Sequence, residues 1–352
     1  MDHDSMAGAK EFIEAGNIMG ITTTIGFELR TDWNNTPFKN ARINNPDQLG
    51  CAYVCIHGVP HQNIDKADSF LSKIRAARNE RNQDMVKSIN DEIDGINLDF
   101  EKDVFAISNY KHGGSITERH ILYALGKKII KKTETRNELI KYLGKYLKIQ
   151  LTDEQSRDLR DKSNLIYEYD LLNVLKSNFI QRIYIDAKAS EILPVDEVVS
   201  FAHEIGAIPA YAYLGDIGSS ITRDKKPQKF EDGYVDELIT YNKNIGFEAV
   251  AYMPSRNTGK QLERIIGLCE KHELMQINGE DINQPRQSFI CKQLKDKQYG
   301  HLVDNTWALI GHELKASQDV SNGLFAEKNK DKKLEDKIGE YASYGKSLRL
   351  DL

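Results

Sequence analysis

The spacing of the apolar residues changes twice along this 352-residue chain, and this change constrains the fold more than any other feature. Before residue 62 and again from residue 183 onward, short apolar runs alternate with helical patterns. Strands that alternate with helices predict a parallel sheet covered by helices. We expect strands at 21–28, 51–57, 183–185, 208–214, 249–253 and 274–277, and helices at 5–19, 195–205, 234–245 and 261–272.

The middle of the chain has another pattern, because most apolar residues from about 65 to 181 recur at helical spacing. We therefore expect four parts: a first barrel part at 1–62, a mostly helical insertion at 63–182, a second barrel part at 183–314 and a charged C-terminal tail at 315–352. The two barrel parts together approach the ~200–250 residues of a (β/α) barrel, which favours one interrupted domain over two in tandem. In the tail, a weakly amphipathic helix near 334–348 and a solvated segment are both open.

Composition and charge exclude several classes of protein. The formal net charge is −5, which leaves no overall basic surplus for sequence-independent nucleic-acid binding. A hydrophobic content of 40% is too high for a disordered chain, and no apolar run approaches the ~18 residues of a membrane span. Residues 1–4 are too acidic to begin a signal peptide. The four cysteines contain no CxxC pair, so we expect reduced thiols, a cytoplasmic location and no membrane partner.

Polar residues gather where the predicted strands end, at Glu28, His57, Asp216, Arg256, Glu280 and Asp281. The active site of a (β/α) barrel lies at the C-terminal ends of its strands. Ligands of a doubly wound sheet lie there too, so position alone does not separate the two folds. We favour the barrel. Arg256 also precedes a predicted helix, where a guanidinium and backbone N–H groups can bind an anion; the alternative is a proline-containing turn with a solvent-facing arginine.

The segment Asp2-His3-Asp4 and the later Glu28 carry residue types that bind metals. A histidine and carboxylates at neighbouring strand ends can converge on one divalent ion, because imidazole and carboxylate both suit Zn, Mn or Fe. The alternative for Asp2 and Asp4 is capping of the following helix, and for His3 it is a disordered terminus.

These segments resemble motifs of the polymerase and histidinol phosphatase (PHP) family. Asp2-His3-Asp4 before a helix and Gly26-Phe27-Glu28 are similar to the family's second and third strand motifs. Residues 113–125 (GGSITERHILYAL) look like the motif of its helical insertion, and residues 276–283 (QINGEDIN) resemble its last strand. The resemblance covers most of residues 1–290. It implies a distorted (β/α)7 barrel that binds up to three divalent metals and hydrolyses phosphoesters.

The resemblance also implies roles for individual residues. His3, Glu28 and Asp281 become metal ligands, and Asp2 orients His3. Arg119 and His120 become phosphate-contacting residues, because a guanidinium matches phosphate oxygens; the alternative for both is an ordinary exposed helix start. His57 and His61 are equally open as further metal ligands or as structural histidines.

The chain departs from the family pattern at three places. The family's opening His-x-His strand is missing before Met1, so we expect a barrel that lacks its first strand; truncation of a longer protein at its N-terminus is one open explanation. Tyr213 stands where the family has His-Pro, and Asn283 stands where it has a histidine ligand. With ligands missing, we expect one weakly held metal rather than two or more.

The leading hypothesis is therefore a metal-dependent phosphoesterase that uses metal-activated water, with Mn, Zn, Fe or Mg as its cofactor. Glu28, Arg119, His120 and Arg256 would act on the phosphate group of a nucleotide, a sugar phosphate or an oligonucleotide end. The alternative is a catalytically impaired PHP-like barrel that binds a phosphorylated ligand or regulates. A deaminase-like amidohydrolase is a weaker alternative, because arginine-rich loops favour phosphate over neutral amides.

Overall fold

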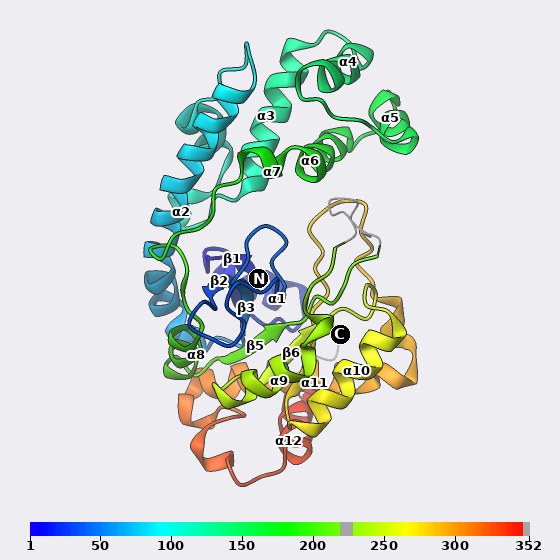
Figure 1. Ribbon diagram of the computed structural model, residues 1–352. Coiled ribbons are helices and arrows are strands. Elements are labelled where there is room, and N and C mark those ends of the chain that lie inside the picture. Colours follow the sequence, from blue (N-terminus) through cyan, green and yellow to red (C-terminus); the bar gives the residue numbers. More distant parts are fainter. Residues whose placement is uncertain (219–227, 348–352) are drawn as a thin grey trace.

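A single mixed sheet of seven strands organises the lower part of the molecule in the computed structural model, which describes residues 1–218 and 228–347 (Figure 1). The hydrogen-bonded order is β1 (Asp2–His3), β2 (Gly26–Asp32), β3 (Cys51–His57), β5 (Ile208–Ala212), β6 (Ala249–Tyr252) and β7 (Met275–Asn278), with β4 (Leu193–Pro194) paired to β2. All neighbours are parallel except β3, which runs antiparallel to both β2 and β5. The fold is thus mixed α/β with a mostly parallel sheet.

The orientation of β3 corrects the expectation of a purely parallel sheet. A parallel neighbour needs a long crossover connection, usually a helix. The segment 33–50 between β2 and β3 contains neither helix nor strand, so the chain simply turns back and β3 pairs antiparallel. Two strand predictions also change: β2 continues past Glu28 to Asp32, and 183–185 forms no strand because α7 (Ile180–Ile183) ends there.

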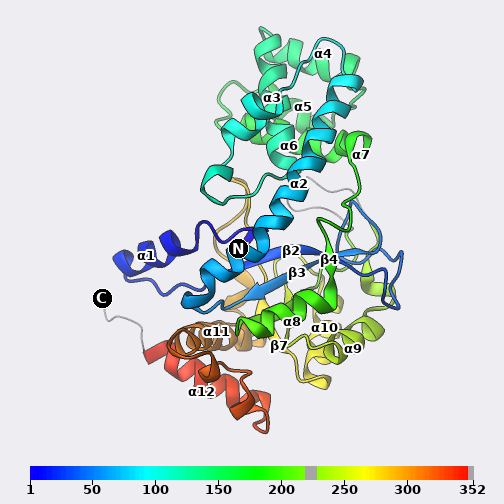
Figure 2. The same cartoon turned by 90° about the vertical axis from the view of Figure 1, so that its left-hand side faces the viewer.

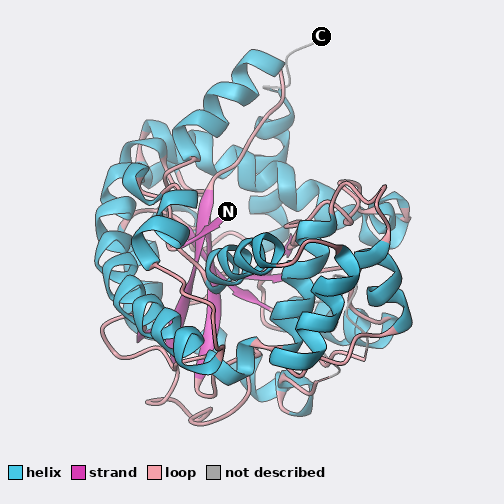
Figure 3. Ribbon diagram, turned by 90° about the horizontal axis from the view of Figure 1, so that it is seen from above, coloured by secondary structure: helices cyan, strands magenta, loops and turns pink. Residues whose placement is uncertain are grey.

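A closed barrel is not confirmed. The ladders form an open path from β1 to β7, and among the described residues no pairing joins β7 back to β1. Helices nevertheless surround the strands when the molecule is seen from above (Figure 3). The part of the fold that is established is therefore a mixed sheet enclosed by helices.

Each face of the sheet packs against its own set of helices. Side chains alternate between faces along a strand, and Val54 and Ile56 of β3 lie in one core while Cys55 between them packs with the other. The first core is covered by α2 (Ile64–Glu92), α8 (Val195–Glu204), α9 (Val235–Asn244) and α10 (Gly259–Lys271). The second core lies between β5–β7 and the helices α11 (Gly300–Gln318) and α12 (Leu334–Ser347) (Figure 2).

The C-terminal segment forms the helix that was one of its two expected alternatives, and this helix packs tightly on α11. A Cβ atom added to Gly311 would lie 2.1 Å from the carbonyl oxygen of Tyr341, and one added to Gly345 would lie 2.3 Å from that of Trp307. The backbones of α11 and α12 therefore approach at two glycines. Residue 348, the end of the expected helix, lies outside the described residues.

A separate helical part stands above the sheet and is joined to it by α2 (Figures 1 and 2). It contains α3 (Glu118–Lys132), α4 (Arg136–Tyr146), α5 (Asp153–Arg160), α6 (Tyr167–Asn178) and α7. The 29-residue α2 spans roughly 44 Å. Its beginning therefore packs in the first core of the sheet, and its end packs in a third core, which residues 85–183 form within the helical part. The helix α1 (Ala9–Met19) lies on the sheet side. None of the described helices is long and apolar enough to cross a bilayer.

A buried cluster of three arginines and three carboxylates joins the helical part to the sheet. This Arg–carboxylate cluster consists of Asp4, Arg30, Arg78, Arg81, Glu118 and Glu191, and Glu118 is its least buried member. Glu191 receives Arg81 Nε at 2.6 Å and is also paired with Arg30, while Arg81 Nη2 lies 2.8 Å from Glu118. Arg78 pairs with Asp4 at the end of β1.

Replacing Glu191 with glutamine tests how far the fold depends on this cluster. The variant Glu191→Gln leaves buried guanidiniums without a full countercharge, so we expect the free energy of unfolding to fall by about 3 kcal/mol. Urea denaturation followed by circular dichroism measures the change. The exposed Glu11→Gln control should change it by less than about 0.5 kcal/mol. An equal effect of both substitutions would show that the cluster is not needed for stability.

Candidate active site

His3 and Glu28 lie side by side, because they occupy the same register of the parallel strands β1 and β2. His3 Nδ1 is 3.7 Å from Glu28 Oε2, and the two side chains are 39% and 28% exposed. Although the ring is partly open to solvent, its Nδ1 atom is buried and has no hydrogen-bond partner within the described chain. The structure therefore brings two of the predicted metal ligands together.

The surroundings of His3 keep its imidazole neutral. The ring lies against Tyr53, with 5.3 Å between the ring centroids. Burial, reinforced by the charge of Arg78, lowers the pKa of His3 to about 3. A neutral imidazole has one ring nitrogen with a free lone pair, which is the form that binds metal ions.

Asp281 lies in the loop after β7, and Asn283 Nδ2 is 3.0 Å from both of its carboxylate oxygens. Thus the residue that stands in place of the family's histidine holds a predicted ligand. Burial raises the pKa of Cys55 well above its usual value, and the charges of Glu28 and Asp281 raise it further. Both carboxylates therefore act on the same thiol, although β2 and β7 are far apart in the strand order.

The structure does not bring Asp2 or His57 to the His3–Glu28 pair. Asp2 is exposed, and as the neighbour of His3 on one strand it points to the opposite face. His57 pairs with Gly26, whereas Cys55 pairs with Glu28. The backbone of His57 is therefore displaced from the Glu28 position by two residues, or about 7 Å along the strand. Burial and the nearby N-terminal amine lower the pKa of His57 to about 3.

His61 instead belongs to a contact between the sheet and α11. Its Nε2 lies 3.0 Å from Glu313 Oε1. The other carboxylate oxygen of Glu313 accepts hydrogen bonds from Thr24 Oγ1 at 2.7 Å and from the Ile25 backbone at 2.8 Å. This arrangement gives His61 a structural partner beside the N-terminal end of β2.

These positions limit how well the residues fit a metal ion. Catalytic metal sites commonly use three protein ligands and keep one position open. In the part of the chain that the structure describes, no group of three or more His, Cys, Asp or Glu side chains is arranged to hold a metal. His3 and Glu28 supply two adjacent donors, so the residues fit a two-donor site and not a complete three-ligand centre.

The predicted phosphate-contacting residues have different surroundings. Arg119 Nη2 lies 3.5 Å from both Asn173 of α6 and Asn283 of the β7 loop, so it reaches the gap between the helical part and the sheet. His120 Nδ1 accepts a hydrogen bond from the Thr117 backbone at 3.1 Å and caps α3. Arg256 is half-buried in the turn between β6 and α10.

Two charged features beside the candidate site were not anticipated from the sequence. Lys176 near the end of α6 is close enough for its charge to lower the pKa of His3, after the larger effects of burial and Arg78. A single lysine on an amphipathic helix gives no sequence signal for such a role. The buried arginines did give a sequence signal. Arg75, Arg78 and Arg81 recur every third residue, which places them on one stripe of α2.

The β7 loop is tied to the helical part. Arg286 donates to both carboxylate oxygens of Asp170 on α6 at 2.7 Å. Asn173 Nδ2 donates to Gln284 Oε1 at 2.7 Å. The loop that carries Asp281 is therefore held by α6 as well as by β7.

Comparison with known proteins gives a fold likeness. No family model matches the chain, and no curated protein matches it. A crystal structure from Bifidobacterium adolescentis, of a protein proposed to be a metal-dependent phosphoesterase, has a TM-score of 0.52 at 18% identity over 85% of this chain and 82% of that one. The structure of an amidohydrolase from Chromobacterium violaceum, with bound sulfate and no metal, has a TM-score of 0.49 at 15% identity over 81% of this chain and 76% of that one. The first likeness shows a shared fold.

The loop after β5 has a buried carboxylate in place of the expected histidine site. Glu231 Oε1 accepts hydrogen bonds from Tyr211 Oη at 3.0 Å and from the Leu214 backbone at 2.8 Å, while its Oε2 is buried without a partner in the described chain. Tyr213 donates to Asp232 at 2.5 Å. Burial raises the pKa of Glu231 from 4.5 to about 7.

This shift predicts a pH dependence of stability. Between pH 4.5 and 7 the folded chain keeps a proton on Glu231 that the unfolded chain releases, so stability falls as the pH rises through this window. The variant Glu231→Gln should lose less stability between pH 4.5 and 8 than the unsubstituted chain, by up to about 3 kcal/mol. Urea denaturation at several pH values measures this difference. The exposed Glu335→Gln control should keep the original profile, and an identical profile for Glu231→Gln would contradict the assignment.

Proposed function

We propose that this chain is a PHP-like, metal-dependent phosphoesterase whose metal is held by His3 and Glu28. The observation that carries the proposal is the His3–Glu28 pair, in which a buried imidazole nitrogen without a hydrogen-bond partner lies 3.7 Å from a carboxylate oxygen. Imidazole and carboxylate are the ligands that Zn, Mn and Fe share. His3 and Glu28 would hold such an ion, which would supply Lewis-acid chemistry for a phosphoester.

Positive charge from the helical part supports a phosphate-bearing substrate. Arg119 of α3 reaches the β7 loop, and the charge of Lys176 of α6 acts on His3. A guanidinium can donate two parallel hydrogen bonds to phosphate oxygens, and an ammonium serves as a point charge. We infer that Arg119 and Lys176 bind the phosphate group while Glu28 and His3 hold the metal, and that residues 63–182 cover the site.

Further residues complete the proposed assignment. Asp281 would provide a third metal ligand, although it is held by Asn283 in this structure. His120 and Arg256 would contact the substrate beside Arg119. The fold shared with the Bifidobacterium adolescentis protein supports the proposal only at the level of architecture.

A second candidate is a phospho-ligand binding module without turnover. It is favoured by the arrangement of the possible metal ligands, because no group of three or more such side chains is found among the described residues. Such a module would be stabilised by phosphate compounds, since a ligand that binds only the native state raises its stability. It would release no inorganic phosphate.

Metal-dependent turnover separates the two candidates. We expect the purified chain, treated with EDTA and then titrated with Mn²⁺ or Zn²⁺, to hydrolyse p-nitrophenyl phosphate or a nucleotide. His3→Gln and Glu28→Gln should each lower kcat/KM by about 100-fold or more, because each removes a metal ligand. Lys176→Met should raise KM more than it lowers kcat.

The matched control is His272→Gln, an equal substitution in the short turn between α10 and β7, away from the pair. It should keep the full rate. If no metal supports hydrolysis and the melting temperature still rises with phosphate compounds, the chain is a binding module and not an esterase. If His3→Gln is as active as His272→Gln, the assigned site is wrong.

A further inference from the structure

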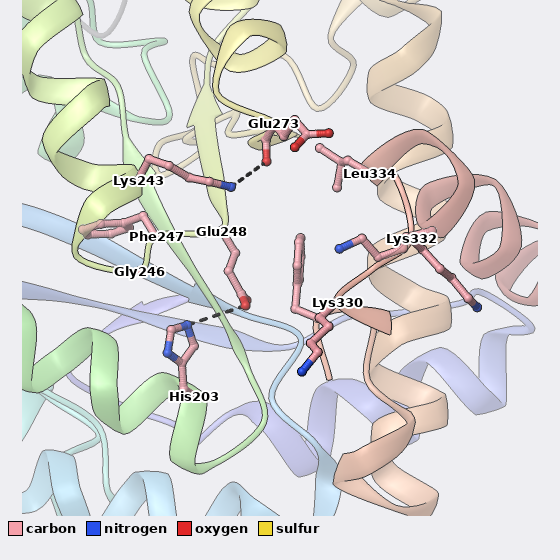
Figure 4. Close-up of a pocket in the computed structure, with 11 residues that line it drawn as sticks. His203, Lys243, Gly246, Phe247, Glu248, Glu273, Lys330, Lys332 and Leu334 are labelled. Carbon is pink, nitrogen blue, oxygen red and sulfur yellow. Dashed lines mark hydrogen bonds and ion pairs between the residues drawn. The ribbon is translucent and has the colours of Figure 1, made fainter. Parts of the chain in front are cut away.

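A lysine-rich pocket lies beside the N-terminal ends of β6 and β7 (Figure 4). Its volume is about 290 Å³. The turns before β6 and β7 form one side of it, and the segment from Phe325 to Lys337 forms the other. His203, Lys243, Glu248 and Glu273 line the first side, with Lys330, Lys332 and Lys337 on the second.

The position of this pocket separates it from the His3–Glu28 pair. Residues 246–248 lie immediately before β6, and Glu273 lies just before β7, so the pocket adjoins the N-terminal ends of these strands. His3 and Glu28 lie within β1 and β2, which β3 and β5 separate from β6, and Asp281 follows the C-terminal end of β7. A ligand of one site therefore does not contact the other.

Positive charge predominates in the pocket. Four lysines and His203 face two carboxylates, Glu248 and Glu273. The exposed lysines have weak partners: Lys332 pairs with Glu340 at 2.7 Å, with both side chains nearly half exposed, and Lys243 donates to the carbonyl oxygen of Glu273 at 3.1 Å. Exposed pairs of this kind contribute little, so these ammonium groups can turn to a stronger anion.

Lys337 is the residue that points to a ligand. It is only 9% exposed, and its ammonium lies 5.1 Å from the centre of the Phe325 ring. Within residues 1–218 and 228–347 the structure gives this ammonium no hydrogen bond and no ion pair. Glu248 acts on Lys337 electrostatically, but burial raises the pKa of this carboxyl to about 8, so it is largely protonated near neutral pH. The Lys337 charge therefore has no strong countercharge among the described residues, and an anion in the pocket would supply one.

The walls of the pocket also favour a ligand that has an apolar part beside its anionic group. Phe247, Phe325 and Leu334 give the pocket an apolar side, while the lysines supply its charge. Ammonium groups bind phosphate as point charges. Ligand pockets usually occupy ~300–1,000 Å³, so this one is close to the lower end of that range and suits a small molecule.

We propose that this pocket, named here the Lys337 pocket, binds a small phosphorylated molecule, with Lys337, Lys330 and Lys243 around its phosphate group. The site is separate from the proposed esterase centre, so it binds a second ligand and not the reacting phosphoester. It exists whether or not the chain is an enzyme.

Calorimetric titration of the full chain at low salt tests the proposal, with inorganic phosphate and glycerol 3-phosphate as probes and glycerol as the uncharged match. We expect both phosphates to bind and glycerol to give no signal. Lys337→Met keeps the apolar stem and should weaken binding about tenfold or more, because one charge-assisted contact is lost. The exposed Lys330→Gln should weaken it less and does not threaten folding.

Two controls make the result specific. Lys87→Met removes a 73% exposed lysine of α2 and should bind both probes as the unsubstituted chain does. His3→Gln disturbs the proposed esterase centre and should also leave this binding intact. The proposal is overturned if neither phosphate binds, if Lys337→Met and Lys330→Gln both bind with unchanged affinity, or if His3→Gln abolishes the titration.

Discussion

The position of the helical part over the sheet depends on the buried Arg–carboxylate cluster. The six residues of the cluster come from five places: Asp4 after β1, Arg30 of β2, two arginines of α2, Glu118 at the start of α3 and Glu191 before β4. Three positive and three negative groups balance, so no net charge is buried. Because losing any one member leaves a buried charge unpaired, the arrangement resists change at all five places together.

The same cluster shapes the candidate site. Asp4 has a positive φ of 52°, a conformation that aspartate tolerates better than most residues, and its carboxylate is fixed by Arg78. This fixes the end of β1, where His3 meets Glu28. Burial alone would raise the pKa of Glu118, but Arg30, Arg78 and Arg81 hold it well below its usual range. Glu118 is therefore ionised beside Arg119, and it starts the helix that carries the predicted phosphate contact.

Much of the fold could be predicted from the sequence, and the reasons for the failures are physical. The apolar period located β3, β5, β6 and β7 within one or two residues, because each strand is bounded by turns and buries an apolar face. The direction of β3 could not be predicted, since it depends on whether a long loop hides a crossover helix. The spacing of the α2 arginines places them on one stripe, but charged helix positions usually are exposed, so their burial follows only from the packing of the helical part on the sheet.

The part of the candidate site that depends on the pairing of β1 with β2 was predictable from the sequence. The part that depends on how the helical part contacts the β7 loop was not. His3 and Glu28 meet because parallel strands in register place them together, a relation that adjacent motifs already imply. Asp281 is different, because its carboxylate is held by Asn283 on a loop that Arg286 ties to Asp170 of α6. The distance between Asp281 and the His3–Glu28 pair is thus set by how the helical part docks on the sheet. Since the Arg–carboxylate cluster joins the helical part to the sheet, completion of the proposed metal site would depend on buried charges that lie outside it.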